Sequence, residues 1–243
     1  MVVTRRVLVT RPQPGADETA ERLVAMGFEP VVMPLTQIVP LEVNVDIEPT
    51  AYDAVAITSV NAVRHAPPEL LAALRHKPVF AVGDASALAA REAGFDDVRS
   101  AAGTARELAA LILRECKAGT RLIHPVGRER TAGFAETLSA GNILLTPVEV
   151  YGADEISYPS SALEDTAAGG PLWGALALSP RAGKILSGFA GRPELGNLFA
   201  STRFFCISHN AARPLDRIAR ERIFVSEQPT EESVILMLGA VAA

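Results

Sequence analysis

The chain has 243 residues, and at roughly 100–200 residues per domain this length predicts one large or two small domains. A composition of 49% hydrophobic and 21% charged residues is typical of a folded globular protein and excludes a disordered chain. Lys and Arg number 23 against 28 Asp and Glu, a net charge of −5. Because the basic patches are also short, a general nucleic-acid binder is excluded.

The sequence contains no clear membrane-spanning or secretory segment and no cysteine pattern typical of disulfides or metal sites. No stretch reaches the roughly 18 uncharged apolar residues of a membrane helix, so no membrane partner is expected. Arg5 and Arg6 interrupt the apolar start of the chain, which lacks a secretory signal pattern, and a cytoplasmic protein is therefore predicted. Cys116 and Cys206 are too far apart for a disulfide framework or a metal-binding pair, and are expected to be buried thiols.

Short β-branched segments alternate with segments of helical apolar periodicity along the whole chain. The predicted strands are Arg6–Thr10, Pro30–Pro34, Ala54–Thr58, Val79–Val82, Asp97–Ser100, Arg121–His124, Ile143–Val150, Leu172–Leu178, Arg203–Ile207 and Ile223–Ser226. The predicted helices are Glu18–Met26, Ala85–Ala93, Ala105–Glu115, Gly133–Ala140, Pro180–Ala190, Ala211–Ala219 and Glu231–Leu238. This alternation predicts right-handed βαβ units on mostly parallel sheets.

An internal repeat organises these units. At a near-constant offset, Ser59 lines up with Ser179 and Thr104 with Thr230, in the same order along the chain. The second set of units lacks its fourth member unless it takes the one at the N-terminus. We therefore predict a discontinuous α/β domain, residues 1–36 plus 155–243, with a continuous α/β domain, residues 40–150, inserted into it.

The chain must then cross between the domains twice, near residues 34–42 and 147–156. The two crossings have similar extended sequences, and side by side they predict a two-stranded β-ladder that acts as a hinge. Ligands of open parallel sheets bind beyond the carboxyl ends of the strands. A ligand in a cleft between the two domains is therefore expected.

Small and polar residues follow the predicted strands. Ser, Thr and Asn also cap helices, so capping alone remains an alternative explanation for them. However, N–H groups at a helix N-terminus bind anions, and hydroxyls and glycines allow a carboxylate or phosphate to approach closely. The candidates for binding a ligand with many negative groups are Thr10, Arg11, Thr58, Ser59, Gly83, Ser86, Gly127, Arg128, Ser179, Ser208, His209, Asn210 and Thr230.

Other chemistries lack their motifs. There is no GxxxxGK[ST] phosphate loop and no GxGxxG fingerprint, and the histidines have no metal-binding spacing, so no metal site is expected. His124 and His209 stand at strand ends, where ligand contact and a structural role both remain open. Tyr151 follows a predicted strand at the second crossing. Its phenol could donate a proton to a leaving group, or the ring could simply pack at the hinge.

The ordered motifs resemble the uroporphyrinogen-III synthase family over nearly the whole chain. They are Val7–Pro12, Ile57–Val63, Val82–Ala87, His124–Gly127, Val150–Ala153, Ser179–Pro180 and Pro229–Glu232. The resemblance implies two flavodoxin-like domains joined by the two-stranded ladder. It also implies a hydro-lyase of tetrapyrrole and heme biosynthesis that cyclises hydroxymethylbilane to uroporphyrinogen III, inverting ring D and losing water. No cofactor is expected, and a monomer is.

The resemblance also implies roles for single residues. Tyr151 takes the place of the family's tyrosine near the second crossing and is the candidate catalytic residue, while Ser86 takes the place of a threonine hydroxyl. One segment departs from the family pattern, because Ala211 replaces a threonine. His209 or Asn210 would have to substitute for that hydroxyl.

Two other functions remain open on the sequence. One is a non-catalytic two-domain binding protein for a small polyanionic ligand, which would share the cleft but lack a proton donor. The other is a sugar-phosphate enzyme that uses the Ser and Thr residues at the helix N-termini. It would bind a monophosphate and ignore tetrapyrroles.

Overall fold

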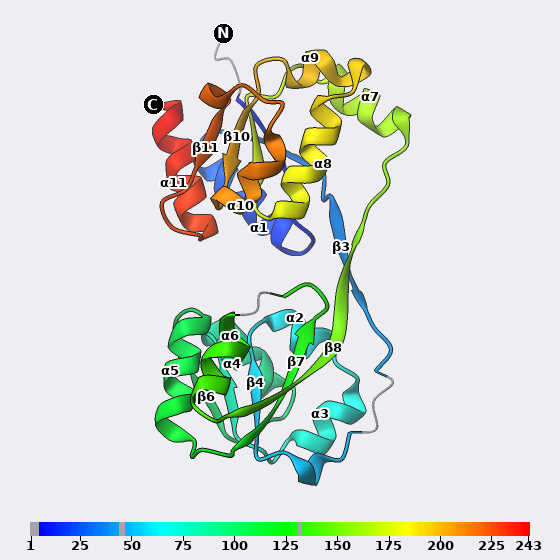
Figure 1. Cartoon of the computed structure of the whole chain (residues 1–243). Helices are drawn as coiled ribbons and strands as arrows, with labels where there is room; N and C mark the ends of the chain where they lie inside the picture. The colour runs from blue at the N-terminus through cyan, green and yellow to red at the C-terminus, as the bar shows by residue number, and fades with distance from the viewer. Residues whose placement is uncertain (1–4, 44–46, 131–132) are drawn as a thin grey trace. The chain divides into compact units, whose positions relative to one another are not determined.

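The computed structural model describes residues 5–43, 47–130 and 133–243 (Figure 1). The chain divides into two compact units, the first formed by Met1–Gln37 and Asp154–Ala243 and the second by Ile38–Ala153. Each unit is a mostly parallel sheet with helices on both faces, so the predicted flavodoxin-like α/β fold class is confirmed. None of the described helices is long and apolar enough to cross a membrane.

The sheet of the first unit has the strand order β11-β10-β9-β1-β2, and all its neighbouring strands are parallel. In order along the chain this is the 2-1-3-4-5 arrangement of flavodoxin-like sheets. The strands are β1 (Arg6–Val9), β2 (Glu29–Val32), β9 (Gly174–Ala177), β10 (Arg203–Cys206) and β11 (Ile223–Val225).

Helices cover both faces of this sheet. On one face, α1 (Gly15–Ala25) and α11 (Glu231–Ala242) contribute Leu23, Val234 and Leu238 to the core. The other face is covered by α7 (Ser160–Ala168), α8 (Pro180–Ala190), α9 (Gly196–Phe199) and α10 (His209–Ala212), with the 3₁₀ turns η2 (Pro193–Leu195), η3 (Arg213–Leu215) and η4 (Arg220–Arg222) in the connections.

The sheet of the second unit has the order β3-β8-β7-β4-β5-β6. Its five parallel strands are β4 (Ala54–Ile57), β5 (Val79–Ala81), β6 (Val98–Ser100), β7 (Arg121–Gly127) and β8 (Leu144–Glu155). When the strands are matched through the internal repeat, they follow the same order as the first sheet. The two sheets differ only in which strands come first along the chain. β1 and β2 begin the first unit, whereas the matching strands β7 and β8 come last in the second.

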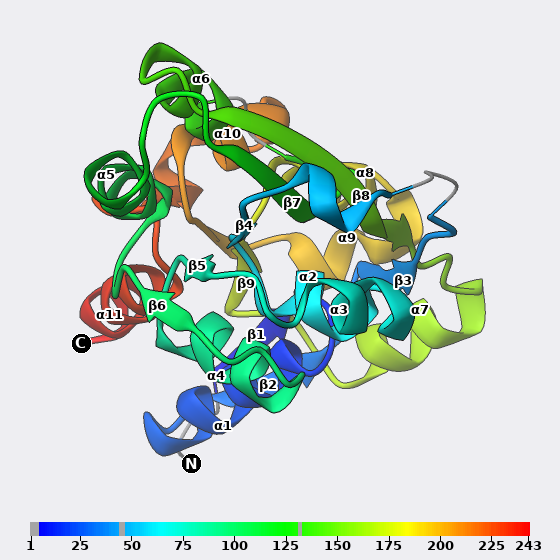
Figure 2. The same ribbon diagram turned by 90° about the horizontal axis from the view of Figure 1, so that it is seen from below.

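In the second unit, α5 (Ala105–Glu115) and α6 (Gly133–Ala140) lie side by side on one face of the sheet (Figures 1 and 2). The other face is covered by α2 (Val60–His65), α3 (Pro68–Leu74) and α4 (Asp84–Glu92), and η1 (Pro49–Ala51) precedes β4. Both faces of β4 are consequently buried, and its four residues are all apolar.

The chain passes between the units in β3 (Thr36–Pro40) and β8, which are hydrogen-bonded neighbours. Just beyond the two ends of β3, the N–H of Leu41 donates to the carbonyl of Val150 and the N–H of Ile156 to that of Leu35, each at 3.0 Å. These pairs run in opposite directions along the two segments, so the crossings are antiparallel. Each segment thereby satisfies backbone groups of the other.

The ten predicted strands are present, but their ends differ in places. Both strands continue past their predicted ends. β7 extends to Gly127 because it pairs with β8 as far as Gly127 and Tyr151, and β8 extends to Glu155 because it also pairs with β3. The predicted helix over 211–219 is wrong. An α-helix covers only His209–Ala212 and gives way to a 3₁₀ turn, since Pro214 has no N–H to donate and its ring clashes with the preceding turn.

Two glycines of α8 provide a matched test of its packing. A Cβ on Gly183 would overlap the carbonyl oxygen of Ala211, whereas a Cβ on Gly188 would meet nothing within 4 Å. We expect Gly183→Ala to lower the free energy of unfolding by about 1–3 kcal/mol through overpacking. Gly188→Ala should raise it by about 0.5–1 kcal/mol because glycine is unfavourable in a helix. Urea denaturation measures both, and equal effects of the two substitutions would contradict the close approach of α8 to α10.

Candidate functional site

The predicted site residues form two groups, one in each unit, and most of them lie where a strand ends or the following helix begins. In the first unit, Thr10 and Arg11 follow β1, Ser179 follows β9, Ser208, His209 and Asn210 follow β10, and Thr230 precedes α11. In the second unit, Thr58 and Ser59 follow β4, Gly83 and Ser86 follow β5, Gly127 ends β7, Arg128 follows it, and Tyr151 lies within β8.

Four of the candidate hydroxyls cap helices, as the capping alternative predicts. Each accepts a hydrogen bond from a backbone N–H of the helix that follows: Ser59 from Asn61 at 3.1 Å, Ser179 from Ala182 at 3.0 Å, Ser208 from Ala211 at 3.3 Å and Thr230 from Ser233 at 3.2 Å. Accepting this bond uses only a lone pair, and the hydroxyl keeps its proton. The same side chain can therefore cap a helix and donate to an anion.

Thr10 and Ser86 are less accessible than the capping residues. Thr10 is 2% exposed, and its hydroxyl donates to the carbonyl of Leu176 at 2.6 Å. Its proton therefore links β1 to β9. Ser86 lies in the first turn of α4 and is 4% exposed. A ligand could reach either residue only if the surrounding side chains moved.

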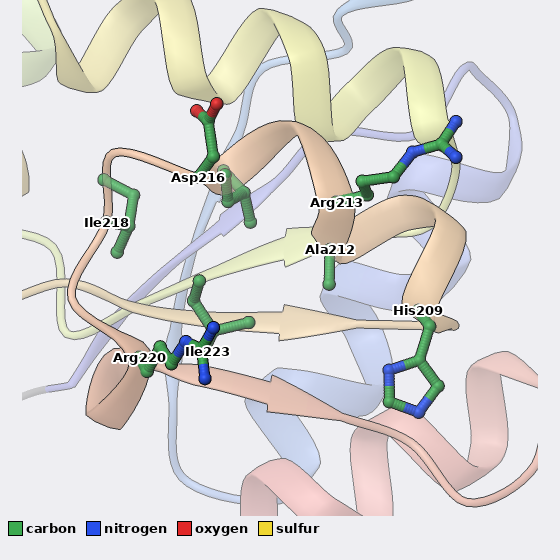
Figure 3. A pocket seen from close by; sticks show the side chains of 8 residues that line it. His209, Ala212, Arg213, Asp216, Ile218, Arg220 and Ile223 are labelled. Atoms are coloured by element: carbon green, nitrogen blue, oxygen red, sulfur yellow. The ribbon is translucent and has the colours of Figure 1, made fainter.

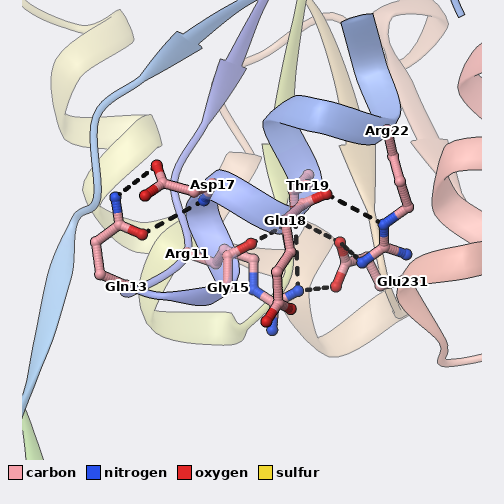
Figure 4. A network of polar contacts seen from close by, with 8 residues as sticks. All are labelled: Arg11, Gln13, Gly15, Asp17, Glu18, Thr19, Arg22 and Glu231. Carbon is pink, nitrogen blue, oxygen red and sulfur yellow. Dashed lines mark hydrogen bonds and ion pairs between the residues drawn. The ribbon is translucent and has the colours of Figure 1, made fainter. Parts of the chain in front are cut away.

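Arg11 is held by a carboxylate of its own chain (Figure 4). Its guanidinium pairs with Glu231, the first residue of α11, and the hydroxyl of Thr19 contacts the same carboxylate. Arg22 binds the other side of this carboxylate at 3.0 Å. Burial lowers the pKa of Arg11 from its ordinary value. The guanidinium that the sequence predicts as a ligand contact is thus paired with Glu231, and this ion pair joins the end of β1 to the start of α11.

Arg128 lies at the exposed end of β7. Its side chain is 56% exposed, and its Nε lies 3.7 Å from Glu149, which also pairs with Arg130 at 2.7 Å. Exposed pairs of this kind contribute little to stability. Arg128 can therefore exchange Glu149 for a ligand carboxylate at small cost.

Tyr151 packs across the end of β7. The register between β7 and β8 shifts at Val126/Gly127, so that Gly127 lies opposite Tyr151, whose carbonyl accepts from the N–H of Arg128 at 2.9 Å. A Cβ on Gly127 would come within 2.7 Å of the tyrosine ring. The ring also lies near His65, with centroids 6.1 Å apart. The half-buried ring of Tyr151 therefore packs directly against the backbone of Gly127, in space that a side chain there would fill.

His124 is the buried histidine of the second unit. It is 5% exposed, its Nε2 lies 3.0 Å from the hydroxyl oxygen of Thr58, and its ring meets the ring of Phe134 edge-on at 5.4 Å. Burial, with a smaller contribution from the charge of Arg130, lowers the pKa of His124 to about 4. The imidazole is neutral at pH 7. Sequence reasoning left its role open, although its place between a buried strand and the following Pro was a signal for burial.

Neither thiol is poised for nucleophilic chemistry. Cys206 is fully buried, and burial raises its pKa to about 12. Burial likewise raises the pKa of the half-buried Cys116. Both stay protonated at neutral pH. The predicted burial is confirmed for Cys206, whereas Cys116 is only half-buried. Within the described part of the chain, no group of three His, Cys, Asp or Glu residues is placed to hold a metal ion.

The first unit also contains a cavity of about 420 Å³ that sequence reasoning missed (Figure 3). It is lined by His209, Ala212, Arg213, Leu215, Asp216, Ile218, Arg220 and Ile223. Figure 3 shows the guanidinium groups of Arg213 and Arg220 pointing to different sides, so they do not converge on one anion. The cavity begins at the candidate residue His209 and runs away from the end of β10.

Comparison with known proteins shows which family the sequence matches. The family model described as Uroporphyrinogen-III synthase HemD matches residues 17–235. The uroporphyrinogen-III synthetase of Helicobacter pylori superposes with a TM-score of 0.63 at 15% identity, covering 98% of this chain and 100% of that one. A mutant uroporphyrinogen III synthase of Thermus thermophilus gives 0.53 at 15% identity, covering 99% and 98%. A search of curated proteins finds no match. The two solved structures share the fold with this chain.

The depressed pKa of His124 predicts a loss of stability in acid. The unfolded chain takes up a proton near pH 6.5, whereas the folded chain does so only near pH 4, so stability falls as the pH drops through this window. We expect the wild type to lose roughly 2 kcal/mol more than His124→Gln between pH 7 and pH 5. Urea denaturation at both pH values measures the difference.

The control for this comparison is His76→Gln, which removes an exposed histidine. It leaves His124 in place, so the large loss of stability in acid should remain. Identical losses in the wild type and His124→Gln would show that the imidazole is not held neutral.

Proposed function

Because the chain belongs to the uroporphyrinogen-III synthase family, we propose that it closes linear hydroxymethylbilane to uroporphyrinogen III, with inversion of ring D and loss of water. The observation that carries the proposal is the family match over residues 17–235. The geometry supports it, because each unit presents hydroxyl and backbone N–H donors at the ends of its parallel strands. The substrate is an octacarboxylate, and such donors suit it.

The donors are mostly neutral. Ser59, Ser179, Ser208 and Thr230 each keep a hydroxyl proton after capping a helix. The macrodipole of the helix adds positive potential at the same place without a formal charge. We propose that ring carboxylates of the substrate bind at these ends in both units. Holding the two ends of the linear substrate together would supply part of the rate, since ring closure is limited by orientation.

Tyr151 is the proposed proton donor. Loss of the hydroxyl group requires a proton, and the phenol of Tyr151 is half-buried beside the end of β7, next to Arg128. Its ring is fixed by contact with Gly127 rather than left mobile on the surface. We propose that the reaction is that of a hydro-lyase, carried out by a monomer in the cytoplasm without a metal or organic cofactor, as the family resemblance and the sequence lead us to expect.

The alternative of a non-catalytic binding protein makes use of the same donors. It would bind the polyanion at the strand ends and would have no use for an acid at Tyr151. The family match favours the synthase. Turnover separates the two, because a binding protein leaves hydroxymethylbilane to close spontaneously to the type I isomer.

Replacing Tyr151 by Phe tests the proposed acid. We expect Tyr151→Phe to form uroporphyrinogen III with kcat lowered by about 100-fold, at the low end of general acid catalysis because the leaving hydroxyl is already activated by its pyrrole. The assay supplies fresh hydroxymethylbilane and separates the type III and type I isomers by chromatography. Tyr52→Phe, in the core of the same unit, should retain wild-type activity. A wild-type protein that yields only type I would exclude the synthase.

Substitutions at two glycines distinguish the positioning of Tyr151 from the binding of substrate. Gly127→Ala should displace the Tyr151 ring and lower kcat by about 10-fold or more, since small misplacements of a reacting group are costly. Gly83 has an extended backbone, and a Cβ there would meet only Gly103, at 3.9 Å. Gly83→Ala should therefore fold normally but raise KM, because the Cβ obstructs the N-terminus of α4. Steady-state kinetics and urea denaturation measure both variants, and an unchanged KM for Gly83→Ala would exclude binding at α4.

A further inference from the structure

The contact between His124 and Thr58 joins two neighbouring strands of the second sheet. Ala54 of β4 lies opposite Leu122 of β7, so His124 lies level with the residue two before Thr58, on the same face of the sheet. The imidazole reaches along this face, and its Nε2 lies 3.0 Å from the Thr58 hydroxyl oxygen. The buried side chain of His124 is thus within hydrogen-bond distance of Thr58, a candidate binding residue at the strand end.

We propose that His124 is a positioning residue that holds the Thr58 hydroxyl so that its proton points to a carboxylate of the substrate. The proposal rests on the proposed function. It extends that function to a residue that touches no substrate itself, and it makes the recognition of one carboxylate depend on a buried imidazole.

The direction of the hydrogen bond decides what Thr58 can bind. A hydroxyl has one proton and two lone pairs, and a neutral imidazole has one N–H and one bare nitrogen. If Thr58 donates to a bare Nε2, its proton is used and only lone pairs remain, which repel a carboxylate. If Nε2–H donates to Thr58, the hydroxyl proton is left for the ligand. Only the second arrangement serves an anionic substrate.

The surroundings keep the imidazole in its neutral form. His124 is 5% exposed, with the ring of Phe134 against it and the charge of Arg130 near enough to oppose protonation. Its pKa of about 4 means that the ring stays neutral across the physiological range. The Thr58 hydroxyl therefore meets a neutral partner rather than a titrating one.

Thr58 and Ser59 then form a pair of consecutive donors. In the proposed arrangement the oxygen of Thr58 accepts from Nε2–H of His124, 3.0 Å away, and that of Ser59 accepts from the N–H of Asn61 at 3.1 Å. Each oxygen is fixed by a hydrogen bond from the protein, and each hydroxyl retains one proton. Because Ser59 has an extended backbone, the two side chains leave the chain on opposite sides, and Thr58 is the donor that His124 orients.

The tautomer can be read without any substrate. ¹⁵N NMR of protein labelled in its histidine rings, with the His124→Gln spectrum to assign the signal, should show the proton of His124 on Nε2 at pH 7. A proton on Nδ1 would mean that Thr58 donates to the ring. That result overturns the positioning role whether or not the protein is a synthase.

Kinetics test the link to the substrate. Thr58→Val and His124→Leu should each raise KM for hydroxymethylbilane about 10-fold, the effect of losing a hydrogen bond to a charged group, with little change in kcat. The double variant should be no worse than Thr58→Val, because His124 acts only through Thr58. His124→Gln retains an N–H donor and should recover most of the lost affinity.

The outcomes separate the two proposals. His124 would be only a packing residue if the increases in KM of the two single variants multiplied in the double variant. The same conclusion would follow if His124→Leu lost stability but kept its KM. Should His124→Leu not fold, the comparison of His124→Gln with Thr58→Val decides instead: a Gln variant as impaired as Thr58→Val overturns the positioning role. A wild type without synthase activity overturns the proposed function, and with it the carboxylate that Thr58 would bind.

Discussion

Parallel pairing of neighbouring strands is the constraint on which the rest of the structure depends. In the first sheet, and from β4 to β8 in the second, every strand runs in the same direction as its neighbour. Each strand must therefore return through a connection that begins at the same edge, and most of these connections start a helix there. The unpaired N–H groups of those helices require acceptors. The Ser and Thr hydroxyls at this edge are thus demanded by the fold before any ligand uses them.

This double use explains how an acidic protein can suit an acidic ligand. The net charge of −5 excludes a surface that attracts anions in general. Capping hydroxyls and helix N-termini act only at short range and add no charge. Arg11, the most enclosed of the candidate cations, is already neutralised by Glu231. Recognition would then depend on where the donors point rather than on how many positive charges are present.

The sequence predicted the strands and their order along the chain well, but it predicted the contacts of the residues that follow them poorly. Strands and the helices over 105–115 and 180–190 follow from local periodicity, and the candidate residues follow from the strands. The partner of Arg11 lies 220 residues away and that of Thr58 lies 66 away, so both depend on sheet register that no local pattern records. The position of the Tyr151 ring depends on a register shift at Gly127, which no local sequence pattern predicts either. Pro214 was visible, and its effect on the helix over 211–219 could have been predicted.

The two sheets share one strand order but use the chain differently, and this has a consequence for synthesis on the ribosome. All the strands of the second unit have emerged once β8 is complete. At that moment the first unit has only β1 and β2 of its described sheet, because β9, β10 and β11 come later. Two strands with one helix bury too little apolar surface to be stable. The inserted unit can therefore fold first, while β1 waits with one edge unpaired and exposed to other chains.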